Sequence, residues 1–299
     1  MNHSDEVDEK TLDPKDPDTA ASLNNLALNL YNQARYSEAE SLFKRALEIF
    51  EELFGPKHPG TATALNNLAV SVAEQIRYSE AEQLHKRALK IREKVLGPEH
   101  LDTAASLNNL AESIESQGRY SEAEPIYEKA LKITEKELGS KHPSTAISLN
   151  NLALNLNRQA RYSEAEILYK RALEIKEKEL GSKHPSTAIS LNNLALSLSG
   201  QARYSEAEIL YKRALEIFEK VSGQEHPNTA ASLNNLAGNL EEQNKYSKAE
   251  PLYKRALKIR EKVLGPEHPD TVESLHNLAE NLDAQGKYSE AKEIRERYR

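Results

Sequence analysis

Six histidines recur at one position of a repeated pattern, and imidazoles at regular spacing are candidate metal ligands. They are His58, His100, His142, His184, His226 and His268. If each histidine lies between consecutive helices, its neighbours are at least one helix spacing away, roughly 8–10 Å. A zinc ligand lies about 2 Å from its ion, so adjacent histidines cannot share one. We therefore expect each histidine to act in a turn or at the start of a helix, and we predict no metal site.

The residue types that perform catalysis form no catalytic pattern in this sequence. Ser, Glu and His recur at the same positions in successive copies, as structural residues do, and neither a glycine-rich phosphate loop nor a His-Glu-x-x-His motif occurs. The chain has no cysteine, which excludes disulfides, thiolate chemistry and cysteine-bound zinc. We predict a protein that is not an enzyme and that carries no cofactor.

The histidines belong to a pattern with a period of 42 residues, whose most regular marker is a threonine. The motifs Leu-Asn-Asn-Leu-Ala (as at 23–27), Tyr-Ser-Glu-Ala (as at 36–39) and Gly-Pro-Lys-His-Pro (as at 55–59) return with it. Tandem copies of one unit build an elongated domain in which each copy contacts its neighbours. The threonines are Thr19, Thr61, Thr103, Thr145, Thr187, Thr229 and Thr271.

Each copy is expected to form two helices. Over 19–33 the apolar residues Leu23, Leu26, Ala27 and Leu30 follow a helical period, which predicts a first helix, helix A. Ser37 and Glu40 have the spacing of a capping box, so we expect Ser37 to cap helix B. Helix B should run to about Leu53 and end at Gly55, and its buried residues should be Ala39, Leu42, Phe43, Ala46, Leu47 and Ile49.

The spacing Leu23-x2-Leu26-Ala27-x2-Leu30, followed by Ala39-x3-Phe43, resembles the tetratricopeptide repeat. The longer 42-residue unit, with Leu-Asn-Asn-Leu-Ala and Gly-Pro-Glu-His-Pro-Asp, is similar to the repeats of kinesin light chains and their prokaryotic relatives. The resemblance covers about 19–299. It implies an all-α fold, a right-handed superhelical solenoid of seven helix-turn-helix repeats, with helix A lining the concave face.

The repeat boundaries follow from the period. We expect repeats at 19–60, 61–102, 103–144, 145–186, 187–228, 229–270 and 271–299. The last copy has Tyr298 and Arg299 where the first has Ala46 and Leu47, which indicates a polar C-terminal cap. Residues 1–18 form an acidic segment, and its part from Glu9 aligns with the end of a repeat, so we expect a vestigial half-repeat there.

One asparagine position of helix A is occupied in all seven copies, and we call this set the asparagine ladder. Asparagine in a helix interior costs about 0.5–0.7 kcal/mol relative to alanine, so the repetition needs an explanation. The resemblance implies that the ladder contacts the backbone of a bound peptide. The alternative is that these amides form hydrogen bonds between adjacent repeats. The ladder consists of Asn25, Asn67, Asn109, Asn151, Asn193, Asn235 and Asn277.

Helix A positions that differ between copies should determine what the concave groove binds. Two variable positions give an apolar centre in repeats four and five, from Ile147, Leu154, Ile189 and Leu196. The groove becomes acidic toward the C-terminal end, at Glu241 and Glu280. Kinesin light chains use basic residues near the end of helix A for acidic peptides, and here Arg158 holds such a position but faces several acids. We therefore expect an apolar anchor and basic residues in the partner.

Charge and hydropathy narrow the class of partner. The formal net charge of −7 disfavours nucleic acid, because phosphate binding needs clustered Lys and Arg. No apolar run is long enough for a signal peptide or a membrane span, so we expect no membrane contact and a cytoplasmic protein. The sequence predicts a protein–protein interaction scaffold that binds a peptide segment. Two alternatives stay open, a self-associating structural protein and the sensor or adaptor part of a signalling complex.

Overall fold

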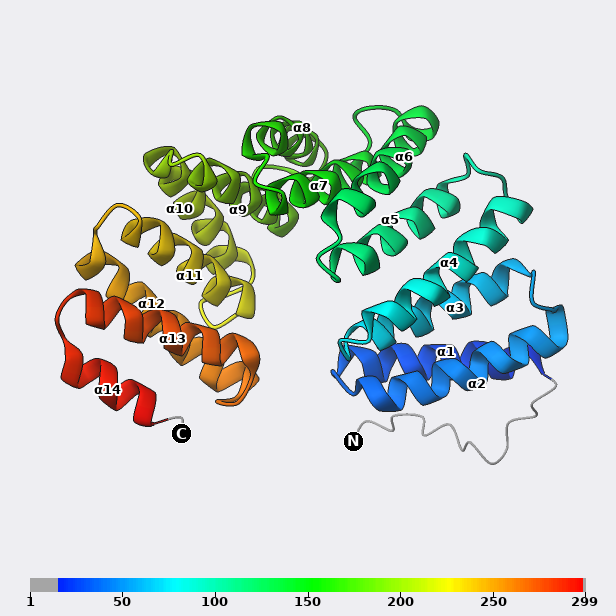
Figure 1. Cartoon of the computed structure of the whole chain (residues 1–299), viewed down its shortest axis with the longest axis horizontal. Coiled ribbons are helices and arrows are strands. Elements are labelled where there is room, and N and C mark those ends of the chain that lie inside the picture. Colours follow the sequence, from blue (N-terminus) through cyan, green and yellow to red (C-terminus); the bar gives the residue numbers. More distant parts are fainter. Residues whose placement is uncertain (1–15, 298–299) are drawn as a thin grey trace. The chain divides into compact units, whose positions relative to one another are not determined.

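The computed structural model describes residues 16–297, and these form fourteen α-helices. Consecutive helices form antiparallel pairs, one pair for each 42-residue copy (Figure 1). The odd-numbered helices are the A helices: α1 Pro17–Asn32, α3 Pro59–Ala73, α5 Leu101–Glu115, α7 Pro143–Arg158, α9 Pro185–Gly200, α11 Pro227–Glu241 and α13 Pro269–Ala284. The even-numbered helices are the B helices: α2 Tyr36–Phe54, α4 Tyr78–Val95, α6 Tyr120–Leu138, α8 Tyr162–Leu180, α10 Tyr204–Val221, α12 Tyr246–Leu264 and α14 Tyr288–Glu296.

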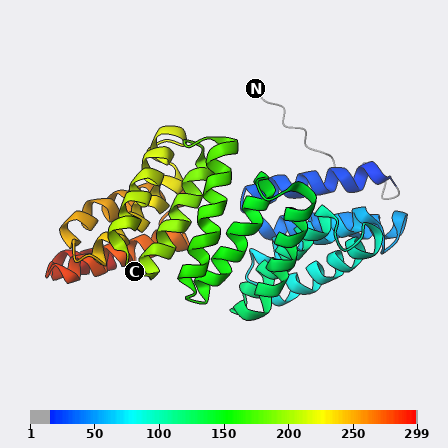
Figure 2. The same ribbon diagram turned by 90° about the horizontal axis from the view of Figure 1, so that it is seen from above.

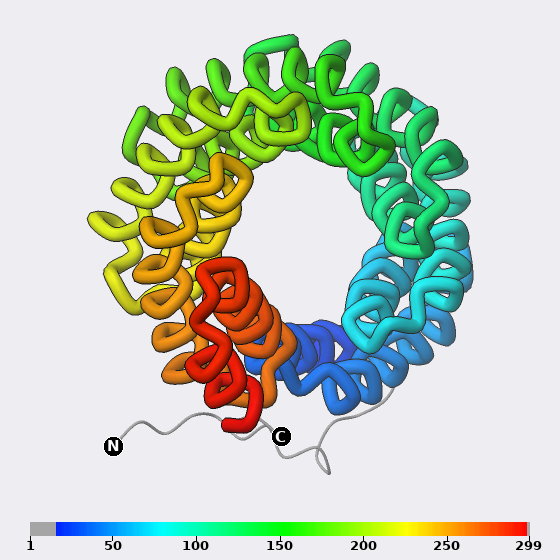
Figure 3. The backbone as a smooth tube through the Cα atoms, turned by 60° about the vertical axis from the view of Figure 1, so that its left-hand side comes forward, coloured from blue at the N-terminus to red at the C-terminus, as the bar shows by residue number. Residues whose placement is uncertain are grey.

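The chain divides into two compact units, Met1–Ser140 with α1–α6 and Lys141–Arg299 with α7–α14. Within each unit the helices follow one another side by side (Figure 2). Contacts also join A helices of adjacent repeats, such as α3 with α5 and α9 with α11. Each unit therefore has one layer of A helices and one of B helices, which can be followed as two rows in the backbone trace (Figure 3). Helix-turn-helix pairs and an all-α fold are as the sequence predicts. None of the described helices is long and apolar enough to cross a membrane.

The core of a repeat is built from alanines and large apolar residues that alternate along the helices. All six residues expected in the first B helix, from Ala39 to Ile49, are buried. Ala39 and Ala46 allow the neighbouring helices to approach closely, and Phe43 fills the space between them. This part of the sequence-based prediction is confirmed. The expected half-repeat at 9–18 lies largely outside the described residues, as do Tyr298 and Arg299.

The linker before each A helix from α3 to α13 is stabilised by its histidine, as expected, while Asp16 caps α1. In all six linkers the histidine Nδ1 accepts a hydrogen bond from the backbone N–H two residues later, at 3.1–3.2 Å. This bond satisfies one of the free N–H groups at the helix start. The repeated threonine has a related role, since the Thr61 hydroxyl donates to the carbonyl of Gly55 at 2.9 Å. Gly55 has φ 84° and ψ 165°, a conformation open essentially only to glycine.

The prediction that Ser37 caps the first B helix in a capping box is wrong. The first B helix begins at Tyr36 with Arg35 at the N-cap position, and no side chain caps it. Glu40 is needed elsewhere: its carboxylate is buried and accepts hydrogen bonds from Lys44 at 2.6 Å and from Gln75 and Arg77 of the next repeat at 2.7 Å. Ser37 instead donates to Gln75 at 3.2 Å.

We call this arrangement the glutamate clasp, because one carboxylate joins two repeats. It recurs at Glu82, Glu166, Glu208 and Glu250, each of which accepts from a glutamine and from a base of the following repeat. Burial disfavours the ionised form of Glu82, but hydrogen bonds from Lys86, Gln117 and Arg119 outweigh it and lower the pKa to about 2. The buried glutamate is therefore ionised, and its hydrogen bonds connect two adjacent repeats.

Replacing Glu82 with glutamine should destabilise unit 1 by about 1.5–3 kcal/mol, the range for a hydrogen bond to a charged group. Because folding lowers the pKa of Glu82, its contribution is present above pH 4.5 and is lost as the pH falls toward 2. Urea unfolding of E82Q and wild type at pH 7 and pH 3 measures both effects. Glu38→Gln is the matched control, since Glu38 pairs with Arg35 at the surface and neither residue belongs to a clasp. Equal effects of the two changes would contradict the prediction.

The turn between helices A and B places one residue of every copy in the left-handed region. Gly118 and Gly286 hold this position with φ 76° and 75°, but Ile76 holds it with φ 64°. A β-branched residue is strained in this region, by roughly 1–2 kcal/mol. The Ile76 side chain is 75% exposed, so its removal sacrifices little buried surface.

We predict that Ile76→Gly raises the free energy of unfolding by about 1 kcal/mol, because relief of strain exceeds the entropy cost of glycine. The reciprocal change Gly118→Ile should lower it. Thermal and urea unfolding of the two variants measures the pair of effects, and a loss of stability in I76G would show that the turn is not strained.

Candidate functional site

The A helices of unit 2 line a groove of about 720 Å³. Its walls come from α7, α9, α11 and α13, with tyrosines of the B helices at its base. Six of the residues predicted from sequence lie in this lining: Leu154, Arg158, Leu196, Asn235, Glu241 and Asn277. Tyr204, Tyr211, Tyr253 and Glu273 also line it and were not predicted. We call this surface the unit 2 groove.

Three of the four residues of the predicted apolar centre are solvent-exposed, and Leu154 is half-buried. Ile147 is 54% exposed, Ile189 43% and Leu196 48%. Ile147 precedes Leu154 on α7 by seven residues, as Ile189 precedes Leu196 on α9, so each pair lies on one face of its helix. The two isoleucines extend the apolar surface along the helices beyond the residues that line the unit 2 groove.

The asparagine ladder has different surroundings in the two units. In unit 1, Asn67 donates to Asn24 at 2.8 Å and Asn109 to Asn66 at 2.7 Å. For these two asparagines the alternative explanation of the ladder, hydrogen bonds between adjacent repeats, holds. In unit 2, two asparagines that directly precede the ladder position make the link instead, Asn192 to Ser232 at 2.9 Å and Asn234 to Ser274 at 2.8 Å. No hydrogen bond to another described residue engages the side chains of Asn25, Asn151, Asn193, Asn235 or Asn277, the other members of the ladder.

Charges differ between the two ends of the unit 2 groove. Arg158 is exposed at the end of α7 and has no carboxylate partner among the described residues. At the other end, Glu241 accepts hydrogen bonds from Tyr253 at 2.9 Å and from Asn281 at 2.6 Å. Glu280 is exposed on α13 outside the groove lining. The described residues include no group of three or more His, Asp or Glu placed to hold a metal ion.

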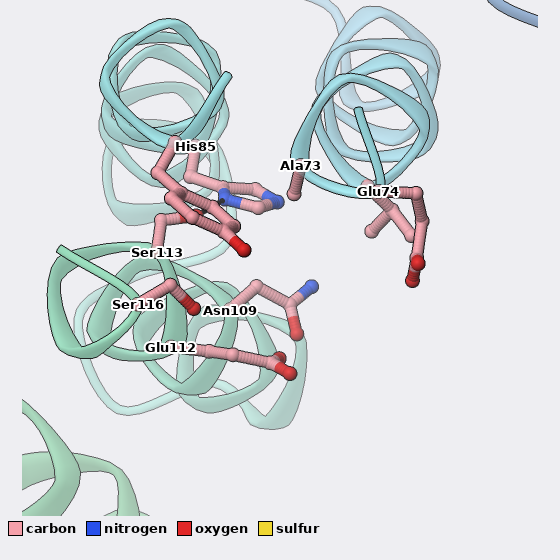
Figure 4. A pocket seen from close by; sticks show the side chains of 9 residues that line it. Ala73, Glu74, His85, Asn109, Glu112, Ser113 and Ser116 are labelled. Carbon is pink, nitrogen blue, oxygen red and sulfur yellow. Dashed lines mark hydrogen bonds between the residues drawn. The ribbon is translucent and has the colours of Figure 1, made fainter. Parts of the chain in front are cut away.

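A second pocket, of about 230 Å³, lies in unit 1 between α3, α4 and α5 (Figure 4). His85 lines it and is 3% exposed, with Nδ1 2.8 Å from the Ser113 hydroxyl. Burial lowers the pKa of His85 to about 4, so the imidazole is neutral at pH 7. Sequence reasoning missed this residue, although one signal was available: His85 stands where other copies have Phe43, Tyr127, Tyr169, Tyr211 and Tyr253.

The chain belongs to the tetratricopeptide repeat family, whose model matches overlapping segments from residue 6 to residue 298. A structure from Podosopora anserina, described as having kinesin light chain nearly identical TPR-like repeats, is 28% identical with a TM-score of 0.60. The match covers 69% of this chain and 98% of that chain. BtubC (BKLC) from P. vanneervenii is 23% identical with a TM-score of 0.60, over 84% of this chain and 92% of that chain.

A STAND protein with a tetratricopeptide repeat sensor from Pyrococcus horikoshii has the same fold at 16% identity, with a TM-score of 0.67. The match covers 94% of this chain and 42% of that protein. No curated protein matches in sequence. Members of this repeat family are in general interaction scaffolds or adaptors, and the resemblance to kinesin light chain repeats is confirmed.

The lowered pKa of His85 predicts a pH effect on stability. The unfolded histidine binds a proton near pH 6.5 and the folded one only near pH 4, so its contribution is present above pH 6.5 and is lost as the pH falls toward 4. The loss should reach up to about 3 kcal/mol. His85→Phe introduces the residue of the first repeat and should lack this pH-dependent loss of stability. Urea unfolding of both proteins between pH 7 and pH 4 tests it, and parallel pH profiles would contradict it.

Proposed function

We propose that the chain is a non-enzymatic scaffold whose unit 2 groove binds an extended segment of a partner protein. The observation that carries this proposal is the convergence of exposed apolar side chains and unbonded ladder amides on one groove. An amide both donates and accepts, so Asn235 and Asn277 can hold a peptide backbone whatever its side chains.

The apolar surface supplies the anchor. Ile147, Ile189 and Leu196 are each more than 40% exposed on adjacent helices, and contiguous exposed apolar surface is typical of interaction sites. Burying such side chains under a partner is favourable by about 25 cal/mol per Å² of apolar surface. The partner segment therefore carries large apolar residues over repeats four and five.

The charges give the segment a direction. Glu241, Glu242 and Glu273 line the groove beyond its apolar part. The Glu273 carboxylate is 3.0 Å from Arg260 and is thus already paired, whereas the Glu241 hydrogen bonds come from uncharged groups. We place the basic residues of the partner toward repeats six and seven, and an uncharged or acidic residue near Arg158.

Removing the anchor should abolish this binding. Peptides selected from a random display library on the full chain serve as probes, and fluorescence polarisation gives their affinities. Leu154→Ala with Leu196→Ala should weaken binding at least about tenfold, since each loses more than a kilocalorie of apolar contact. Asn235→Ala with Asn277→Ala should weaken most selected peptides alike.

Ile167→Ala with Ile209→Ala is the matched control, because these side chains are 62% and 67% exposed on B helices. Unchanged affinity in both groove variants would refute the proposed site. Light scattering against concentration separates this function from self-assembly, which alone predicts a mass that grows without a ligand.

A further inference from the structure

We propose that the unit 1 pocket beside His85 binds a primary ammonium group, either a lysine side chain of a protein or a free alkylamine. The site is separate from the unit 2 groove and does not depend on its function. Nine residues line the pocket, from α3, α4, α5 and the turns that follow α3 and α5. Figure 4 shows His85, Asn109 and Glu112 around the same space.

The pocket contains a smaller ring than the equivalent position of most other copies. At the position of His85 five other copies have a phenylalanine or tyrosine that is almost completely buried, such as Phe43 and Tyr169, and the seventh has Arg295. The smaller imidazole contributes part of the open space in this pocket of about 230 Å³. This is less than the roughly 300–1,000 Å³ of a site for a drug-sized ligand, and it suits one side chain or a small amine.

The polar groups in the lining are mainly hydrogen-bond acceptors. The His85 Nε2 is buried and has no partner among the described residues. Ammonium binding uses the tautomer with the proton on Nδ1, directed to the Ser113 hydroxyl at 2.8 Å, in which Nε2 is an acceptor. The backbone of Asn66 also interacts with the ring and favours its protonated form. Asn109 uses its Nδ2 to donate to Asn66, which leaves its Oδ1 to accept.

Carboxylates supply the charge. Glu112 lines the pocket and has no hydrogen bond or ion pair with another described residue. Desolvation by the surrounding residues and the carboxylates of Glu115 and Glu74 raise the pKa of Glu112, although its side chain is exposed. Glu74 lies at the opposite wall and accepts from Tyr31 at 2.8 Å. A cation in the pocket would relieve this repulsion.

An ammonium fits this set of groups better than other ligands do. It has three N–H donors for Glu112, Asn109 and His85, while the apolar Val70 and Ala73 can contact a methylene chain. An anion would meet two carboxylates, and no lysine or arginine is in the lining. The described groups do not form a metal site, and a single tyrosine is no aromatic cage for a quaternary ammonium.

The test is an NMR titration of the full chain with Nα-acetyl-lysine amide, followed at the ring protons of His85. The probe should shift these signals saturably at pH 7, and the Nε-acetylated compound, which lacks the charge, should not. Glu112→Leu has the residue of repeats four and five and should weaken binding at least about tenfold. His85→Tyr fills the pocket with the residue of four other copies and should abolish it.

The matched control is Glu128→Leu, which removes the same charge at an exposed position of α6 and should bind the probe as wild type does. For both pocket variants, which carry residues that other copies tolerate, an unchanged circular dichroism spectrum verifies folding. A peptide with one lysine separates the two sources: tighter binding than the free probe identifies a protein lysine, and equal binding identifies a small amine. Equal binding of the acetylated compound, wild-type affinity in E112L or H85Y, or no saturation would overturn the proposal.

Discussion

The glutamate clasp is the contact on which the alignment of neighbouring repeats depends. A buried carboxylate is costly unless it is fully hydrogen-bonded, and in Glu40 or Glu208 two of the partners come from the next repeat. A displaced neighbour would leave that charge without these partners. The clasp therefore favours one alignment of adjacent repeats, and the A-helix side chains lie in register as a consequence. The unit 2 groove is a product of this alignment.

Hydrogen bonds between A helices show how a single substitution changes the surface. In unit 2, Asn192 and Asn234 donate to Ser232 and Ser274 of the following repeat. The equivalent residue is Ala64 in the second repeat, which has no hydroxyl, and Ser106 in the third, whose hydroxyl accepts from Arg92 at 2.9 Å. Asn24 instead accepts from the ladder residue Asn67, whose Nδ2 is then engaged. The same motif thus presents bonded amides at Asn67 and Asn109 and unbonded ones at Asn25 and in unit 2.

Sequence reasoning was reliable where a residue acts within its own repeat. The helix pairs, the buried face of the first B helix and the histidine caps depend on spacings of a few residues. It failed at Ser37 and Glu40 because the partners of Glu40 are Gln75 and Arg77, more than 30 residues away in sequence. A local motif competes with such distant contacts for the same side chain. The spacing of a capping box does not indicate whether its glutamate forms hydrogen bonds with another repeat instead. The unit 1 pocket was missed for a different reason: its signal, a histidine at a position that is aromatic in five other copies, is present in the sequence but was not used.

A repeat stack tolerates such departures because each copy contacts only its neighbours. His85 replaces a buried aromatic ring, yet α4 keeps the length and partners of the other B helices. The clasp of that repeat, at Glu82, lies one turn away on the same helix and is intact. A local change can therefore hollow out a pocket without disturbing the alignment of the repeats. Positions that vary between copies, such as those of His85 and Glu112 in unit 1 and of Leu154 and Leu196 in unit 2, are for this reason the places where binding specificity can arise independently.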